Sequence, residues 1–161
     1  MVKVNRKEAE PMKEGYVDNS FASLYYKEMG QGMPLIMLHG NGESHEIFAR
    51  LSELMSRYYR VILMDSRGHG SSLMRGDAAR GELTIPDMAA DVVQVMEFLH
   101  VPRAVILGFS DGANVALETA SCYPGRVSAV VAVSGNALPR GMSTASLLEV
   151  KLKYALWRGL E

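Results

Sequence analysis

Short apolar runs alternate with amphipathic segments along most of the chain. Each run is bounded by glycine, proline or polar residues, and this pattern predicts buried strands at 34–38, 60–64, 103–107 and 127–133. Between the runs, apolar residues recur at helical spacing, which predicts helices that begin after Ser44, at Thr84 and after Gly112. Two shorter strands, at 16–17 and 22–26, are predicted to pair across a polar turn.

Strands that alternate with helices in this way form sheets that are wrapped by helices. The sequence therefore predicts an α/β fold, with a mostly parallel sheet and helices on both of its faces. Glycine-rich segments at 39–44, 65–72 and 108–112 each follow a predicted strand directly. Because ligands of such sheets bind at the carboxyl ends of the strands, we expect these segments to form one functional edge.

Composition and charge narrow the classes of function. The 161 residues, 48% hydrophobic and 22% charged, suit one soluble domain with a single core. A net charge of −1 gives no attraction to nucleic acid or to an anionic membrane. Neither a signal peptide nor a membrane-spanning stretch is predicted, so we expect a cytoplasmic protein. Cys122 is the single cysteine, which excludes a disulfide framework and favours a small buried side chain over a reactive thiol.

Gly108-Phe109-Ser110-Asp111-Gly112 is the most informative segment, because it lies between a predicted strand and a predicted helix. A strand that turns into a helix through G-x-S-x-G holds its serine at the apex of a tight turn. The glycines are needed since a Cβ there would clash with neighbouring backbone. The serine hydroxyl is then exposed, beside a backbone N–H of the helix N-terminus. This arrangement favours an acyl-transfer hydrolase; the simpler alternative, a serine that only caps a helix, would not require the glycines.

With this segment, two further motifs give the chain a resemblance to the α/β-hydrolase fold family, from about residue 15 to residue 136. His39-Gly40-Asn41-Gly42 resembles the oxyanion loop of that family, which follows its third strand. Residues 65–72 are similar to the glycine-rich turn after the fourth strand, and residues 108–112 match the elbow after the fifth.

The resemblance implies a hydrolase that needs no cofactor and acts on a small ester-like molecule. Ser110 would be the nucleophile, and the backbone N–H groups of Asn41 and Asp111 would hold the oxyanion, with Gly42 as the alternative to Asn41. The same groups serve esterases, thioesterases, lactonases and carbon–carbon hydrolases, so the substrate stays open.

Simpler roles are predicted for the histidines. His39 and His69 each precede a glycine in a turn, which favours structural hydrogen bonds. His45 and His100 lie near predicted helix ends, and we expect both to be solvated.

The charged residues of the motifs have simple interpretations as well. Asp65 and Arg67 are interpreted as a pair that braces the loop beneath the elbow. Asp111 lies in the first turn of a helix, where the helix dipole favours a carboxylate. Its functional alternative is a negative charge that selects cationic substrates.

The chain contains no recognisable base or acid to activate Ser110. In this family the order is Ser, acid, His, but the histidines at 39, 45, 69 and 100 all precede Ser110. The acids after it, at 111, 118, 149 and 161, belong to the elbow helix or to a further predicted helix at 143–158. We therefore expect this chain alone to be nearly inactive.

Three explanations are open. In the first, residues 1–136 are the N-terminal part of a hydrolase core and residues 137–161 begin its lid. Strand 127–133 would otherwise form an exposed apolar sheet edge, which natural proteins cover. The second is a non-catalytic protein that binds a small molecule, although such a protein would not need an intact elbow. The third is one half of a split enzyme.

Two other classes are disfavoured. A dinucleotide-binding protein would need G-x-G-x-x-G at its first strand-to-helix turn, which residues 39–44 do not supply. A metal-dependent hydrolase would need clustered histidine and carboxylate ligands, and no residues here have suitable spacing.

Overall fold

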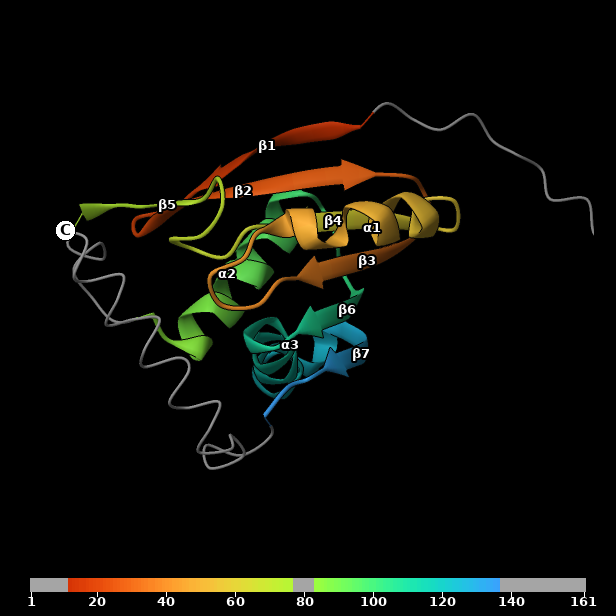
Figure 1. Ribbon diagram of the computed structural model, residues 1–161. Coiled ribbons are helices and arrows are strands. Elements are labelled where there is room, and N and C mark those ends of the chain that lie inside the picture. The colour runs from red at the N-terminus through yellow and green to blue at the C-terminus, as the bar shows by residue number, and fades with distance from the viewer. Residues whose placement is uncertain (1–11, 77–82, 137–161) are drawn as a thin grey trace, which may run out of the picture.

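A computed structural model describes residues 12–76 and 83–136, which form one mixed sheet with helices on both faces (Figure 1). The order of the strands across the sheet is β1-β2-β4-β3-β6-β7, with the short β5 paired to β2. The strands are β1 Lys13–Asp18, β2 Ala22–Met29, β3 Met33–Leu38, β4 Tyr59–Met64, β5 Leu73–Met74, β6 Ala104–Phe109 and β7 Val127–Val133. All were predicted except β5, which is too short to leave a periodic signal.

The directions of the strands confirm a mostly parallel sheet. Strand β3 runs parallel to both β4 and β6, and β6 runs parallel to β7. The hairpin β1–β2 is antiparallel, as is the pairing of β2 with β4. As a result, the loops that follow β3, β4 and β6 leave the sheet at the same edge, where the three glycine-rich segments meet.

Alternate residues of the central strands fill two separate cores. One set packs beneath α2 (Ile85–Phe98) and α3 (Asp111–Cys122), and the other packs beneath the short helix η1 (His45–Phe48) and α1 (Ala49–Met55). The first set includes Ile36, Leu38, Ile62 and Met64, and the second includes Leu35, Met37, Val61 and Leu63. Both faces of β3 and β4 are therefore covered. This explains why the sequences of these strands are continuous apolar runs and do not alternate with polar residues.

The helices begin where the sequence predicts, but they bury fewer apolar residues than expected. Phe48 and Met55, two turns apart, pack on the sheet, whereas Ile47, Leu51 and Leu54, which belong to the same helical spacing, are exposed. In α3, Leu117 lies at helical spacing from the buried Ala113 and is likewise exposed. A helix that rests on a flat sheet buries one stripe of side chains, so a wide apolar face is only partly covered.

Strand β7 is the last strand in the sheet order, and most of it is open. Val127 is buried, but Val131 and Val133 are 45% and 43% exposed within the described residues. The expected apolar sheet edge is therefore present. The predicted helix at 143–158, and with it the lid assigned to 137–161, lies outside the described residues. In the described segments, every helix is too short or too polar to cross a bilayer.

A buried ion pair ties the loop after β4 to α2. Arg67 donates from Nε and Nη2 to the two carboxylate oxygens of Asp91, at 2.6 and 2.7 Å. Both side chains are almost fully buried, and the ion pair raises the pKa of Arg67. The expected pairing of Arg67 with Asp65 is wrong, because Asp91 presents its carboxylate from the buried face of α2. A carboxylate on an apolar helix face requires a partner, and this signal was available in the sequence.

Removing one member of this pair should be costly. Asp91→Ala leaves a buried guanidinium without its counter-charge, and we expect a loss of about 3–5 kcal/mol in the free energy of unfolding. The double variant Arg67→Met/Asp91→Leu should lose much less, because no buried charge remains. Urea denaturation measures both. Arg75→Ala, which breaks the exposed pair with Asp18, is the control and should change stability little. Equal losses in the Asp91 and Arg75 variants would contradict the prediction.

Candidate active site

Ser110 stands at the turn between β6 and α3 with a backbone conformation that is rare outside glycine. Its φ is 52° and its ψ is −117°. The surroundings impose this strain: the Ser110 N–H donates to the carbonyl of Val133 at 2.8 Å, and the Ser110 carbonyl accepts from Ala113 N–H at 2.9 Å. Strained residues of this kind cluster at functional sites. The turn has the strand-turn-helix context that a G-x-S-x-G motif needs.

The two glycines of the motif are required by close backbone contacts. A Cβ on Gly108 would fall on the carbonyl of Gly112, and a Cβ on Gly112 would fall on the carbonyls of Leu38 and His39. The first turn of α3 therefore lies directly against the end of β3. The sequence prediction that side chains here would clash with backbone is confirmed.

The loop after β3 lies next to the elbow. An ideal Cβ placed on Gly40 would lie 3.1 Å from Cβ of Ser110. Asn41 and Gly42 follow on the exposed side of this loop, and Gly42 has a φ of +73°. At the elbow itself, Asp111 begins α3, so its N–H has no acceptor within the helix. The structure thus brings the loop that carries Asn41 beside Ser110 and the first N–H of α3.

His39 is a buried link between two of the glycine-rich loops. Its Nδ1–H donates to the Gly40 carbonyl at 2.7 Å, and its Nε2 accepts from Ser66 N–H at 3.0 Å. A carbonyl only accepts and an N–H only donates, so the ring is neutral with its proton on Nδ1. Burial lowers the pKa of His39, in keeping with this neutral state. The predicted structural role is confirmed.

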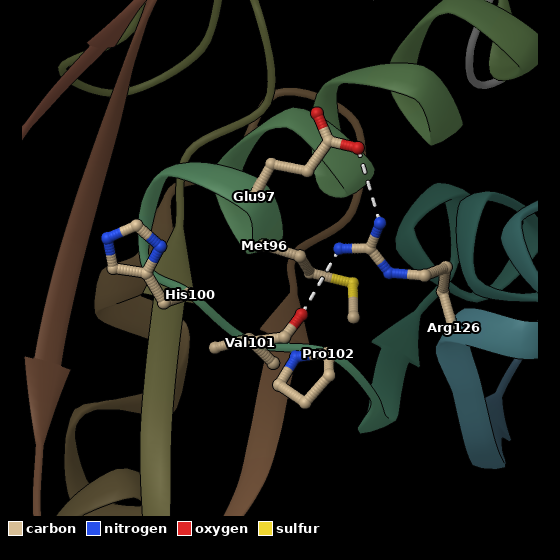
Figure 2. Close-up of a pocket in the computed structure, with 6 residues that line it drawn as sticks. All are labelled: Met96, Glu97, His100, Val101, Pro102 and Arg126. Atoms are coloured by element: carbon tan, nitrogen blue, oxygen red, sulfur yellow. Dashed lines mark hydrogen bonds and ion pairs between the residues drawn. The ribbon is translucent and has the colours of Figure 1, made fainter.

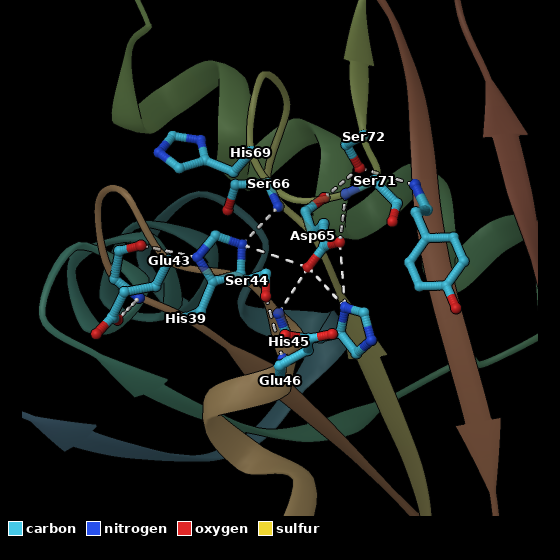
Figure 3. Close-up of polar contacts among 12 residues, drawn as sticks. His39, Glu43, Ser44, His45, Glu46, Asp65, Ser66, His69, Ser71 and Ser72 are labelled. Atoms are coloured by element: carbon cyan, nitrogen blue, oxygen red, sulfur yellow. Dashed lines mark hydrogen bonds and ion pairs between the residues drawn. The ribbon is translucent and has the colours of Figure 1, made fainter. Parts of the chain in front are cut away.

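A second link is the carboxylate of Asp65, which is fully buried at the centre of the polar cluster in Figure 3. It accepts from the backbone N–H groups of His45 and Ser71 at 2.6 and 2.8 Å, and His45 Nδ1 lies 3.0 Å away. The expectation that His45 is solvated is wrong, because its side chain is only 12% exposed. Instead of pairing with Arg67, Asp65 joins the start of η1 to the loop after β4.

The structure confirms the structural role predicted for His69 and the solvent exposure predicted for His100. His69 bridges two loops: its Nδ1 is hydrogen bonded to the carbonyl of Arg67, and its Nε2 to Oδ1 of Asn41, both at 3.1 Å. His100 is exposed in the turn after α2. Cys122, which was expected to be buried, is exposed and donates to the carboxylate of Glu118 in the preceding turn.

Sequence reasoning missed Glu43. Its Oε2 accepts from Gly40 N–H at 2.9 Å, and an ideal Cβ on Gly40 would lie 2.7 Å from the same oxygen. The carboxylate therefore fills the space that a side chain on Gly40 would need. Ser110, in the elbow, lies next to the same space. The available signal was an acidic residue three positions after a turn glycine, which is a spacing suited to a side-chain bond to the backbone.

A pocket lies where β6 and β7 begin, at the end of these strands opposite to the glycine-rich loops. Figure 2 shows the residues that line it. It is lined by Met96, Glu97, His100, Val101, Pro102 and Arg126. Arg126 donates to Glu97 at 3.2 Å and to the carbonyl of Val101 at 3.1 Å. These contacts join the start of β7 to the end of α2, away from Ser110. In the described ranges 12–76 and 83–136, no group of histidine, cysteine or acidic residues is arranged to hold a metal ion.

Comparison with known proteins identifies the family to which this fold belongs. A family model described as the alpha/beta hydrolase fold matches residues 33–159. The chain therefore belongs to the alpha/beta hydrolase fold family, as the motifs indicated.

Particular relatives are similar over part of their length. The pimeloyl-acyl-carrier protein methyl ester esterase of Aliivibrio fischeri is 33% identical over 71% of this chain and 41% of that protein. The magnesium-chelatase 30 kDa subunit of Rhodobacter capsulatus is 36% identical over 58% of this chain and 32% of that protein. Among solved structures, Est816, an N-acyl homoserine lactone degrading enzyme, is 29% identical, with a TM-score of 0.75 over 86% of this chain and 52% of that one. The chain thus spans about half or less of the length of these proteins.

The neutral, buried state of His39 predicts a pH dependence of stability. The unfolded chain takes up a proton on His39 as the pH falls through its ordinary pKa of about 6.5, whereas the folded chain resists protonation. The stability that depends on neutral His39 is therefore complete above that pH and is lost below it, by at most about 1.4 kcal/mol per pH unit.

A variant without His39 tests whether this histidine causes the pH dependence of stability. We expect His39→Asn to be less stable at neutral pH, because the Ser66 N–H loses its buried acceptor, and to show a shallower loss of stability on acidification. Denaturant unfolding at several pH values measures both. The exposed His100→Asn is the control, since asparagine tolerates the positive φ of that position. Parallel pH curves for the wild type and His39→Asn would contradict the prediction.

The close contact at Gly112 predicts a second stability effect. Gly112→Ala should lower the free energy of unfolding by about 3 kcal/mol, because its methyl group would overlap two backbone carbonyls of β3 and the following loop. Gly125→Ala is the matched control: nothing lies within 4 Å of its Cβ position, so little change is expected. Thermal unfolding of the two variants checks this. A Gly112→Ala protein as stable as Gly125→Ala would show that the first turn of α3 can move away from β3.

Proposed function

We propose that this protein is a serine hydrolase that acts on a carboxylic ester or a related acyl substrate, with Ser110 as its nucleophile. The observation that carries the proposal is the strained backbone of Ser110, at a strand-to-helix turn that closely packed glycines enforce. A helix cap would not need this strain. The hydroxyl of such a serine attacks the substrate carbonyl carbon, and the ester C–O bond breaks to give a covalent acyl-enzyme and the alcohol, which takes the proton that the hydroxyl gave up to the base. Water then hydrolyses the acyl-enzyme and releases the acid.

The charge that develops on the carbonyl oxygen needs hydrogen-bond donors that are already in place. We propose that the backbone N–H groups of Asp111 and Asn41 are these donors, with Gly42 as the alternative to Asn41. The Asp111 N–H is the first of α3, and at this end the helix dipole adds to the attraction for an anion. The position of Gly40 next to the side chain of Ser110 supports the assignment of the second donor to the loop after β3.

Within the described residues, no histidine is hydrogen bonded to Ser110. Both ring nitrogens of His39 and of His69 are bonded to other groups, and the ring of His45 is bonded to Asp65 and packs against Tyr25, with ring centroids 5.1 Å apart. His100 lines the pocket at the opposite end of the sheet. We therefore propose that the base and its acid partner are supplied by polypeptide that these 161 residues do not include, as in the N-terminal part of a longer hydrolase.

A second candidate is small-molecule binding without turnover. It is supported by the similarity to a magnesium-chelatase subunit, a relative whose name is not that of a hydrolase. The intact glycines of the elbow favour hydrolysis, because a binding site alone does not need an exposed, strained serine.

Hydrolysis of p-nitrophenyl butyrate distinguishes these functions. We expect the 161-residue chain to be no faster than its Ser110→Ala variant, because a serine without a positioned base is a poor nucleophile. The product of the complete reading frame should be active, and Ser110→Ala should lower its kcat by at least about 10³-fold. Ser121→Ala, at the exposed end of α3, is the matched control and should not change kcat.

Labelling by a fluorophosphonate, followed by peptide mass spectrometry, identifies the modified residue. Ser110 should carry the label in the complete product. An active product that keeps its rate in Ser110→Ala, or that is labelled elsewhere, would disprove the assignment. An inactive product that binds ester ligands would favour the second candidate.

A further inference from the structure

The side chain of Glu43 closes the loop after β3 into a small ring. Gly40 N–H donates to Oε2 of Glu43 at 2.9 Å, and Glu43 N–H donates back to the Gly40 carbonyl at 3.3 Å. Asn41 and Gly42 lie between these two bonds. The ends of the turn are therefore held together by one backbone bond and one side-chain bond.

Packing does little to hold the middle of this loop. Asn41 and Gly42 are exposed, and nothing lies within 4 Å of the Cβ position of Gly42. Gly42, which adopts a positive φ, has no side chain to restrict its backbone. A loop with few contacts depends on its hydrogen bonds. These are the two bonds of Glu43, the bond from His39 Nδ1–H to the Gly40 carbonyl, and the bond between His69 Nε2 and Oδ1 of Asn41.

The carboxylate of Glu43 is also close to the elbow. An ideal Cβ on Gly40 would lie 2.7 Å from Oε2 of Glu43 and 3.1 Å from Cβ of Ser110. The carboxylate and the serine side chain thus lie around the same small volume beside Gly40. A change in the position of Glu43 would alter the backbone that faces Ser110.

We propose that Glu43 is a positioning residue for the oxyanion hole: its Oε2 accepts from Gly40 N–H and so holds the Asn41 N–H in the orientation that stabilises the oxyanion. This inference rests on the proposed function of Ser110 and Asn41. It requires an acceptor at position 43, not a charge. Glutamine, which keeps a carbonyl oxygen at the end of a side chain of the same length, should therefore replace Glu43, and alanine should not.

The first test needs no activity and uses NMR on the 161-residue chain. In Glu43→Ala, the Gly40 amide should exchange with water at least about tenfold faster, and the order parameter of the Asn41 N–H should fall from about 0.85 to below about 0.6. Glu43→Gln should resemble the wild type in both measurements. Glu46→Ala, which removes a neighbouring exposed carboxylate, is the matched control. An unchanged loop in Glu43→Ala would overturn the proposal, as would loosening in Glu43→Gln equal to that in Glu43→Ala.

The second test uses kcat and KM of the complete reading-frame product. Loss of one oxyanion donor lowers kcat by about 10²–10³-fold, so Glu43→Ala, which only loosens it, should lower kcat by about 10–100-fold with KM nearly unchanged. Glu43→Gln should keep a kcat close to that of the wild type. A rise in KM at constant kcat, or a glutamine variant as slow as the alanine variant, would overturn the positioning role. If Ser110→Ala leaves activity unchanged, the proposed function fails, while the NMR result still decides whether Glu43 holds the loop.

Discussion

The close approach of α3 to the end of β3 is the constraint on which the rest of this site depends. It exists because Gly112 has no side chain, so that the first turn of the helix can lie against the carbonyls of Leu38 and His39. Ser110, with its strained backbone, immediately precedes this turn, and Gly40 of the loop after β3 lies next to the serine. The absence of a side chain at Gly112 thus lets a candidate nucleophile, a helix N-terminus and a candidate oxyanion loop lie together.

Buried polar groups then hold the neighbouring loops in register. His39 and Asp65 are inside the protein, and each is bonded within its own loop and to a second segment. His39 joins the loop after β3 to Ser66 in the loop after β4, and Asp65 joins the loop after β4 to His45 at the start of η1. Such groups are costly to bury and are stable only when they are fully paired. They therefore favour one arrangement of the loops after β3 and β4 over others, which is what a site that must meet a developing charge requires. None of these side chains remains free for proton transfer.

Much of the fold could be predicted because hydrophobic periodicity reports burial directly. The strands β3, β4, β6 and β7 and the cap of α2 at Thr84 all appeared in the sequence pattern. Periodicity was less informative about which apolar residues are covered: Leu51 and Leu117 lie on apolar faces but are exposed. Coverage depends on the width of the contact between a helix and a sheet, and that width is a property of the packed structure.

The sequence by itself determined the elements, the mostly parallel sheet and the elbow, because these depend on local spacing and on the G-x-S-x-G motif; the backbone of Leu38 and His39, against which Gly112 packs, is met only in the fold. Only the tertiary structure decided the polar partners. Asp65 and Arg67 are two residues apart, yet they point to different elements, one to His45 and the other to Asp91. Glu43 gained its place beside Ser110 in the same way, through strands that are distant in the sequence. A partner is set by which backbone and side-chain groups meet in space, and spacing along the chain does not encode that meeting.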